Sequence, residues 1–115
     1  AQVLTALDAA AELEREGLDV EVIDLRTLAP LDREAILSSV KKTSKALLLH
    51  EAVRTGGIGG EIAAVIAEEA FEWLDAPVVR VAAIDTPVPY SPPLEEYHLP
   101  QLKDVLDAAR KLAAY

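Results

Sequence analysis

Ala46-Leu-Leu-Leu-His-Glu51 begins the part of the sequence that decides the fold. Its run of four apolar residues is typical of a strand buried on both faces, as in the centre of a parallel sheet. A glycine-rich loop, Thr55-Gly-Gly-Ile-Gly-Gly60, then leads into a helix expected over 61–74, with its apolar face formed by Ile62, Val65, Ile66, Ala70 and Trp73. Val78-Val-Arg-Val-Ala-Ala-Ile84 follows as a second strand. Strand, helix and strand in this order predict two parallel strands joined by a right-handed crossover.

The flanking segments extend this alternation in both directions. Residues 2–16 are expected to form a helix with Gly17 as its C-cap, because apolar residues recur at helical spacing at Val3, Leu4, Leu7, Ala10, Ala11 and Leu13. Residues 19–25 alternate and are rich in β-branched side chains, which predicts a strand. Asp32 is the expected N-cap of a helix ending near Lys42, and residues 101–114 form an amphipathic closing helix. The whole order predicts an α/β fold, a three-layer α/β/α sandwich with a mainly parallel sheet.

Composition restricts the class of protein. The chain has 115 residues, of which 51% are hydrophobic, which suits a single domain over residues 1–115. No cysteine is present, which excludes a disulfide scaffold, a cysteine-ligated zinc site and a thiol nucleophile. A net charge of −9 opposes binding to nucleic acid or anionic membranes and favours a basic partner. The apolar runs are too short to span a membrane, so we expect a cytoplasmic protein, with the mitochondrial matrix as an alternative.

Two positions at strand ends offer chemistry, and each has a simpler interpretation. The glycine-rich loop before Glu61 could present helix N–H groups to an anion. Its spacing matches neither the dinucleotide fingerprint nor a P-loop, which favours close packing of strand against helix at a domain contact. His50 and Glu51 could act as acid and base, could be held by structural hydrogen bonds, or could line a substrate channel.

Other catalytic arrangements lack their partners. Asp24 and Asp85 are not followed by the lysine that a receiver-type phosphoacceptor site needs, and Asp-Thr-Pro occupies that place. No serine stands in a nucleophile elbow, and the two histidines lack metal-ligand spacing. We therefore predict no catalytic, cofactor-binding or metal-ligating residue in this chain.

Three phrases of sequence resemble a known family when they are taken together. They are Val22-Ile-Asp-Leu-Arg-Thr-Leu28 with Pro30-Leu-Asp32, then His50-Glu51 with Thr55-Gly-Gly57, then Asp75-Ala-Pro77 through to Asp85-Thr-Pro-Val-Pro-Tyr90. In this combination the chain is similar to the C-terminal domain of the β subunits of thiamine-diphosphate-dependent 2-oxoacid dehydrogenases, the decarboxylating components of the pyruvate and branched-chain complexes. The resemblance covers almost the whole chain.

This resemblance implies a domain of the transketolase C-terminal type that helps to join two α and two β subunits. In such enzymes thiamine diphosphate and magnesium lie between the α subunit and the other domain of the β subunit. The parent would be an oxidoreductase, and this fragment alone would be inactive. The family also docks the basic subunit-binding domain of the acyltransferase core here, which implies Asp75 and the carboxylate of Tyr115 as docking candidates. Channel or subunit contacts would fall at His50, Glu51, Arg54, Gly56, Gly57, Gly60, Pro89 and Tyr90.

The family pattern also implies strands that this chain lacks. Family members have an inner strand and an edge strand before the helix that begins near Val3. The inner one would lie between the strands expected at 20–25 and 46–49, so its absence would leave a gap in the sheet. We expect the missing segment to lie in a longer parent or on another chain, or the fragment to rearrange.

Two other functional readings remain open from the sequence. Another transketolase-like enzyme, such as transketolase or deoxyxylulose phosphate synthase, would share the surroundings of the glycine-rich loop, although the phrase Asp85–Tyr90 argues against it. A stand-alone acidic interaction module is the second alternative. The choice between pyruvate and branched-chain substrates depends on residues outside this chain.

Overall fold

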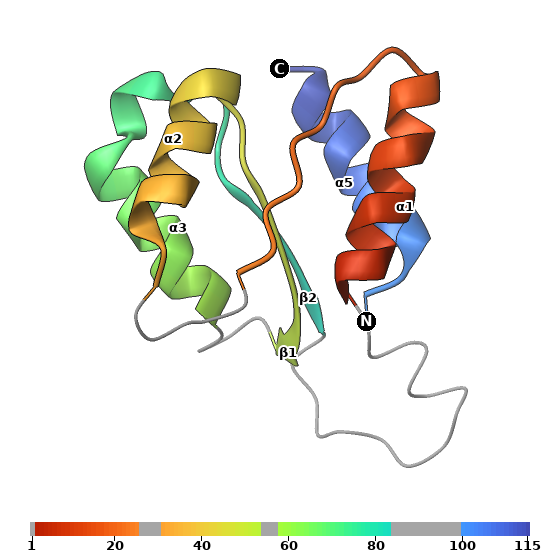
Figure 1. Ribbon diagram of the computed structural model, residues 1–115, viewed down its shortest axis with the longest axis horizontal. Coiled ribbons are helices and arrows are strands. Elements are labelled where there is room, and N and C mark those ends of the chain that lie inside the picture. Colours follow the sequence, from red (N-terminus) through yellow and green to blue (C-terminus); the bar gives the residue numbers. More distant parts are fainter. Residues whose placement is uncertain (1, 26–30, 54–57, 84–99) are drawn as a thin grey trace.

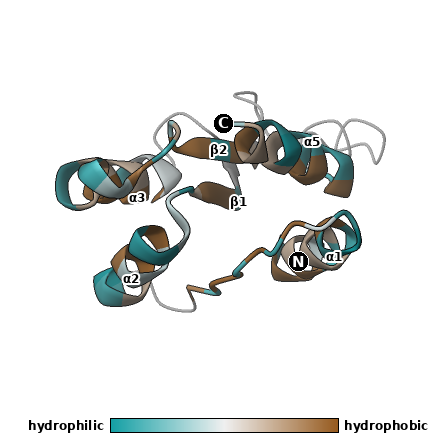
Figure 2. Cartoon of the chain, turned by 90° about the horizontal axis from the view of Figure 1, so that it is seen from above, coloured by the Kyte–Doolittle hydropathy of each residue, from teal (hydrophilic) through white to brown (hydrophobic). Residues whose placement is uncertain are grey.

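The computed structural model describes residues 2–25, 31–53, 58–83 and 100–115 (Figure 1). In chain order the elements are α1 (Gln2–Arg15), α2 (Arg33–Thr43), β1 (Leu47–Val53), α3 (Ile58–Glu69), the 3₁₀ helix η1 (Phe71–Trp73), β2 (Val79–Ala83) and α5 (Leu102–Ala113). Helices α2 and α3 lie on one face of the two strands, and α1 and α5 lie on the other (Figure 2). This arrangement confirms the three-layer α/β/α sandwich.

The sheet confirms the strand–helix–strand unit expected around the glycine-rich loop. β1 and β2 pair in parallel, with Leu47 opposite Val79 and Leu49 opposite Val81. The register is irregular between Leu49 and Val53. Helices cover both faces of β1, as expected for a buried strand (Figure 2), although Leu47 to Leu49 are only partly buried.

Residues 18–25 differ from the prediction of a strand at 19–25. They run as an elongated segment between α1 and α2 (Figure 1), but none of them belongs to a strand. Among the described residues, β1 is hydrogen-bonded only to β2, so no strand lies between β1 and this segment. A strand needs a neighbour for its N–H and C=O groups, and here the expected neighbour is the missing inner strand. Val20 and Ile23 are accordingly 42% and 37% exposed.

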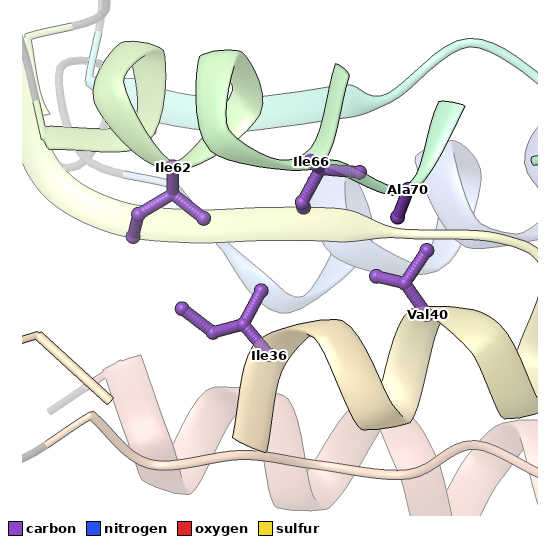
Figure 3. Packing of buried hydrophobic residues seen from close by; sticks show 5 residues of the cluster. All are labelled: Ile36, Val40, Ile62, Ile66 and Ala70. Carbon is purple, nitrogen blue, oxygen red and sulfur yellow. The ribbon is translucent and has the colours of Figure 1, made fainter. Parts of the chain in front are cut away.

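The main core cluster lies between α2 and α3. Ile36 and Val40 project from α2, and they meet Ile62 and Ile66 of α3 together with Ala70 just beyond its end (Figure 3). Ile66 and Ala70 are fully buried, and Leu48 and Val78 pack against the cluster from the sheet side. The predicted apolar face of the helix expected over 61–74 is therefore confirmed at Ile62, Ile66 and Ala70.

The helix ends follow the capping residues in the sequence. Gly17 has a φ of +85°, and the N–H of Leu18 donates to the carbonyl of Leu13 at 2.9 Å, as in a Schellman C-cap. The Asp32 carboxylate accepts from the N–H of Ala35 at 3.1 Å, which confirms the predicted N-cap.

Two predicted apolar faces are only partly buried. Helix α1 packs against α5 and buries Ala9 and Leu13 there, whereas Val3, Leu4 and Leu7 are 38%, 68% and 50% exposed. The described part of the chain therefore covers only part of the apolar face of α1. The helix expected over 61–74 instead runs from Ile58 to Glu69, since Ala70 departs from helical geometry with a φ of −134°.

Candidate functional site

The candidate residues fall at two opposite edges of the sheet. His50 and Gly60 lie toward the carboxyl end of β1, whereas Asp75 and Tyr115 are held next to its amino end. Glu51 is described only as backbone within β1. The remaining candidates lie outside the described residues; they are Arg54, Gly56, Gly57, Pro89 and Tyr90.

The carboxyl edge is defined by close packing of α3 on β1. A Cβ atom placed at Gly59 would lie 2.6 Å from Nε2 and 2.9 Å from Cδ2 of the His50 ring. At Gly60 a Cβ would lie 3.3 Å from the guanidinium of Arg80. These distances support the packing interpretation of the glycine-rich loop, because only glycine lets the helix approach so near. Glu61 adds a negative charge to the first turn, which opposes anion binding there.

His50 has an unusual environment for a candidate acid or base. Both ring nitrogens are buried, and neither has a hydrogen-bond partner among the residues that the structure describes. Residues 2–25, 31–53, 58–83 and 100–115 contain no group of three His, Asp or Glu side chains that could hold a metal ion. The described geometry therefore gives His50 a packing contact with Gly59, and it does not provide the structural hydrogen bonds that we considered.

The amino edge brings together the two docking candidates, which are 40 residues apart in sequence. The N–H of Asp75 donates to the carbonyl of Ser44 at 2.8 Å. The ammonium of Lys45 donates to the main-chain oxygens of Ala113 at 3.2 Å and Tyr115 at 3.0 Å. A cation is favourable at this position because the last carbonyls of a helix lack intrahelical partners. We call Ser44, Lys45, Asp75 and Tyr115 the docking edge.

Three residues beside the docking edge were missed by sequence reasoning. Phe71 is 72% exposed and Trp73 is 45% exposed, although Trp73 was assigned to the apolar face of a helix. The ammonium of Lys41 lies 5.8 Å from the centroid of the Trp73 ring. The available signal was the alternation Phe71-Glu-Trp73, which places an acid between two aromatic residues and does not fit helical periodicity.

Exposed ion pairs fasten neighbouring elements together. Arg110 of α5 donates to Glu16 at 2.8 Å, and Lys42 of α2 donates to Glu21 at 2.7 Å. The hydrogen bond from Arg110 lowers the pKa of Glu16, and the hydrogen bond from Lys42 lowers the pKa of Glu21. The second pair ties residues 18–25 to α2, although no described strand pairs with this segment.

The order of elements, the packing of α3 and the sheet topology agree with one family of domains. The family model described as "Transketolase, C-terminal domain" matches residues 1–105. This chain belongs to that family. As a transketolase C-terminal domain it places its parallel strands between two helix pairs, as Figure 2 shows. In the described part of this domain, no helix has the length and apolarity needed to cross a membrane.

Relatives of this transketolase C-terminal domain include subunits of oxidoreductases. It is 44% identical over 114 residues to the pyruvate dehydrogenase E1 component subunit beta of Rickettsia felis, covering 99% of this chain and 35% of that protein. The mitochondrial E1 subunit beta-1 of rice is 45% identical over 106 residues, covering 92% of this chain and 28% of that protein. The beta subunit of the acetoin:2,6-dichlorophenolindophenol oxidoreductase of Bacillus subtilis is 43% identical, covering 96% and 32%. The chain thus spans about a third of the length of these relatives.

A solved structure has the same fold. It is a split-gene transketolase described as an inactive β4 tetramer, with a TM-score of 0.80 and 33% sequence identity. The likeness covers 96% of this chain and 34% of that chain. The family match and the solved structure therefore agree on the domain family.

Proposed function

We propose that this chain is the C-terminal domain of the β subunit of a thiamine-diphosphate-dependent 2-oxoacid dehydrogenase of the pyruvate dehydrogenase type. The observation that carries the proposal is the 44% identity to a pyruvate dehydrogenase β subunit over 99% of the chain. Residues 1–105, and with them nearly the whole chain, match one domain family, which supports a single domain over residues 1–115. The parent enzyme decarboxylates a 2-oxoacid oxidatively and transfers the acyl group to lipoyl.

The role assigned to this domain is assembly and docking, and the chemistry belongs to other parts of the parent. Thiamine diphosphate and magnesium would be held outside this chain, between the α subunit and the other domain of the β subunit, as the resemblance to these enzymes implies. The domain by itself is accordingly expected to be inactive. The α subunit and a second β subunit are its proposed partners in a heterotetramer, in the cytoplasm of a bacterium or in the mitochondrial matrix.

The docking edge is the proposed contact with the basic subunit-binding domain of the acyltransferase core. Asp75 is exposed, and Tyr115 is 69% exposed. The main chain of Asp75 is held by Ser44 and that of Tyr115 by Lys45, so the same turn places both residues at one edge of the sheet. The net charge of −9 has the sign that attracts a basic protein and speeds its association.

The carboxyl edge is the proposed subunit or channel surface. His50 and Gly60 lie there. The sequence between them contains Arg54, Gly56 and Gly57. Glu51, Pro89 and Tyr90 complete this proposed set. Within this set His50 packs against Gly59, which favours a role in holding the surface together over acid–base catalysis.

An Asp75→Asn substitution in the assembled parent enzyme tests the proposal. We expect overall activity with the acyltransferase core to fall, together with salt-sensitive binding of the subunit-binding domain. Decarboxylation followed with an artificial electron acceptor should be unchanged, because Asp75 lies outside the proposed active site. Equal loss of both activities would contradict a docking role, and Asp8→Asn on α1 serves as the matched surface control.

The competing reading is the C-terminal domain of a transketolase-like enzyme of another type. The 33% identity to a transketolase chain keeps it open, although the 43–47% identity to oxidoreductase β subunits favours our proposal. A parent that transfers ketol groups between sugar phosphates without forming acyl-lipoyl would decide for transketolase. A stand-alone acidic interaction module would show neither activity.

A further inference from the structure

The turn between α2 and β1 has an unusual backbone conformation. Ser44 has a φ of +65°, and in the part of the chain that the structure describes it is the only residue other than glycine with a positive φ. Ser44 ends α2 at the place where a glycine is typical, and its N–H donates to the carbonyl of Val40 at 2.7 Å. The left-handed region is unfavourable for a residue with a Cβ atom, so surrounding contacts must hold Ser44 there.

Residues 43–46, which we call the linking turn, make contacts with two segments that are distant in sequence. The carbonyl of Ser44 accepts from the N–H of Asp75 at 2.8 Å. The ammonium of Lys45 donates to the main-chain oxygen of Tyr115 at 3.0 Å, at the end of α5. The end of α2 and the end of α5 lie at the same end of the molecule (Figure 1). Neighbouring residues of one turn therefore hold two separate segments.

The two contacts share one peptide unit. The atoms of a peptide unit lie in one plane, so the carbonyl of Ser44 and the Cα atom of Lys45 move together when the backbone of Ser44 rotates. Rotation of Ser44 to the extended region would carry its carbonyl away from Asp75 and draw the Lys45 ammonium away from α5. Conversely, loss of either contact removes part of what holds Ser44 in the left-handed region. An element with two such states can couple the segments that it contacts.

We propose that the linking turn is a conformational latch, which releases the end of α5 and the segment at Asp75 together. In the closed state Ser44 is left-handed and both contacts are made, as the structure shows. In the open state Ser44 is extended and both segments are free. Coupling is reciprocal, so a restraint on the end of α5 also restrains Asp75. This inference concerns the motion of the two segments and does not depend on what binds to them.

The test is amide hydrogen exchange, measured residue by residue by mass spectrometry on the full-length parent chain. Lys45→Met removes the contact with α5 and leaves the contact with Asp75 untouched. The amides of Tyr115 and Asp75 should nevertheless both exchange faster, by about fivefold or more. Ser44→Gly should slow both amides by about threefold or more, because glycine adopts a positive φ without a steric cost. Lys111→Met, at an exposed position of α5, is the matched control and should leave the amide of Asp75 unchanged.

The latch requires the two amides to respond together and in opposite directions to the two variants. If Lys45→Met speeds exchange at Tyr115 alone, or at neither amide, the segments move independently and the inference is overturned. Faster exchange with Ser44→Gly at either amide would overturn it as well. The amide of Ala70, which donates to the carbonyl of Ile66 at 2.8 Å in the core, is the reference for global unfolding. Equal acceleration there in the Lys45 variant would show loss of the whole fold and would also overturn the latch.

Discussion

The ammonium of Lys45 donates a hydrogen bond to the main-chain oxygen of Tyr115 across a sequence separation of 70 residues. Lys45 stands just before β1, and Tyr115 follows the last turn of α5. Because Ser44 next to it accepts from the N–H of Asp75, one short turn positions two distant segments. The turn between α2 and β1 therefore holds the residues of the docking edge in place.

Replacing Lys45 by Met should release the end of α5 while keeping the length of the side chain. The carbonyl of Ala113 and the oxygen of Tyr115 would lose their donor, so we expect faster amide hydrogen exchange over the last turn of α5. Binding of the subunit-binding domain should weaken as well. Lys111→Met, a change on the same helix at an exposed position, is the control. Unchanged exchange in the Lys45 variant would show that the contact does not order this end.

Gly59→Ala should destabilise the domain by about 1–3 kcal/mol, the usual cost of overpacking, because the new methyl group would overlap the His50 ring. Gly60→Ala meets only the flexible end of Arg80 and should stay within about 1 kcal/mol of the parent sequence. Urea unfolding measures both. Combining Gly59→Ala with His50→Ala should recover part of the loss, and no recovery would argue that the cost comes from elsewhere.

Ile66 is the test of the core cluster. Ile66→Ala should lower the free energy of unfolding by about 2–5 kcal/mol, whereas Ile66→Val should cost about 0.5–1.5 kcal/mol. The reason is that truncating this fully buried side chain would leave a cavity between α2 and α3. Leu7→Ala, at a half-exposed position of α1, should cost much less. Similar losses for Ile66 and Leu7 would contradict the packing described for this side of the sheet.

Acid should loosen the ion pairs that fasten α1 and residues 18–25. The pKa values of Glu16 and Glu21 are lowered in the folded state by Arg110 and Lys42. Their stabilisation is therefore complete above the unfolded glutamate pKa of about 4.3 and is lost as the pH falls through the lower folded-state values. Substituting both by Gln should flatten the decline of the urea midpoint between about pH 5 and about pH 3, the interval around the glutamate pKa. Glu14→Gln should leave the slope unaltered.

The isolated 115-residue chain should unfold with low cooperativity or self-associate. Among the described residues, 18–25 have no strand neighbour and none of them is buried, so this segment adds little to the cooperative core. A circular dichroism melt with sedimentation analysis measures this. A sharp transition at high temperature in a monomer would mean that the missing inner strand is dispensable.

Sequence reasoning succeeded where structure depends on local signals. Gly17 and Asp32 cap their helices as expected, since capping is decided within one turn. It failed for residues 19–25, because a strand depends on its neighbour and the described residues supply none. Trp73 was misassigned because helical periodicity does not reveal that the backbone changes course at Ala70.

The candidate site was only partly accessible from sequence. Resemblance to the family pointed to Asp75 and Tyr115, but their common anchorage at Ser44 and Lys45 is a tertiary relationship that no local pattern contains. The contact between Lys41 and Trp73 likewise joins two elements that only the folded chain brings together.

The position of the single tryptophan decides what intrinsic fluorescence reports about this domain. Trp73 is already 45% exposed in the folded chain, so its emission should change little when the aliphatic core opens. The same indole stands where a partner is proposed to arrive. Intrinsic fluorescence of this domain is therefore a gauge of occupancy at one edge and a poor gauge of unfolding.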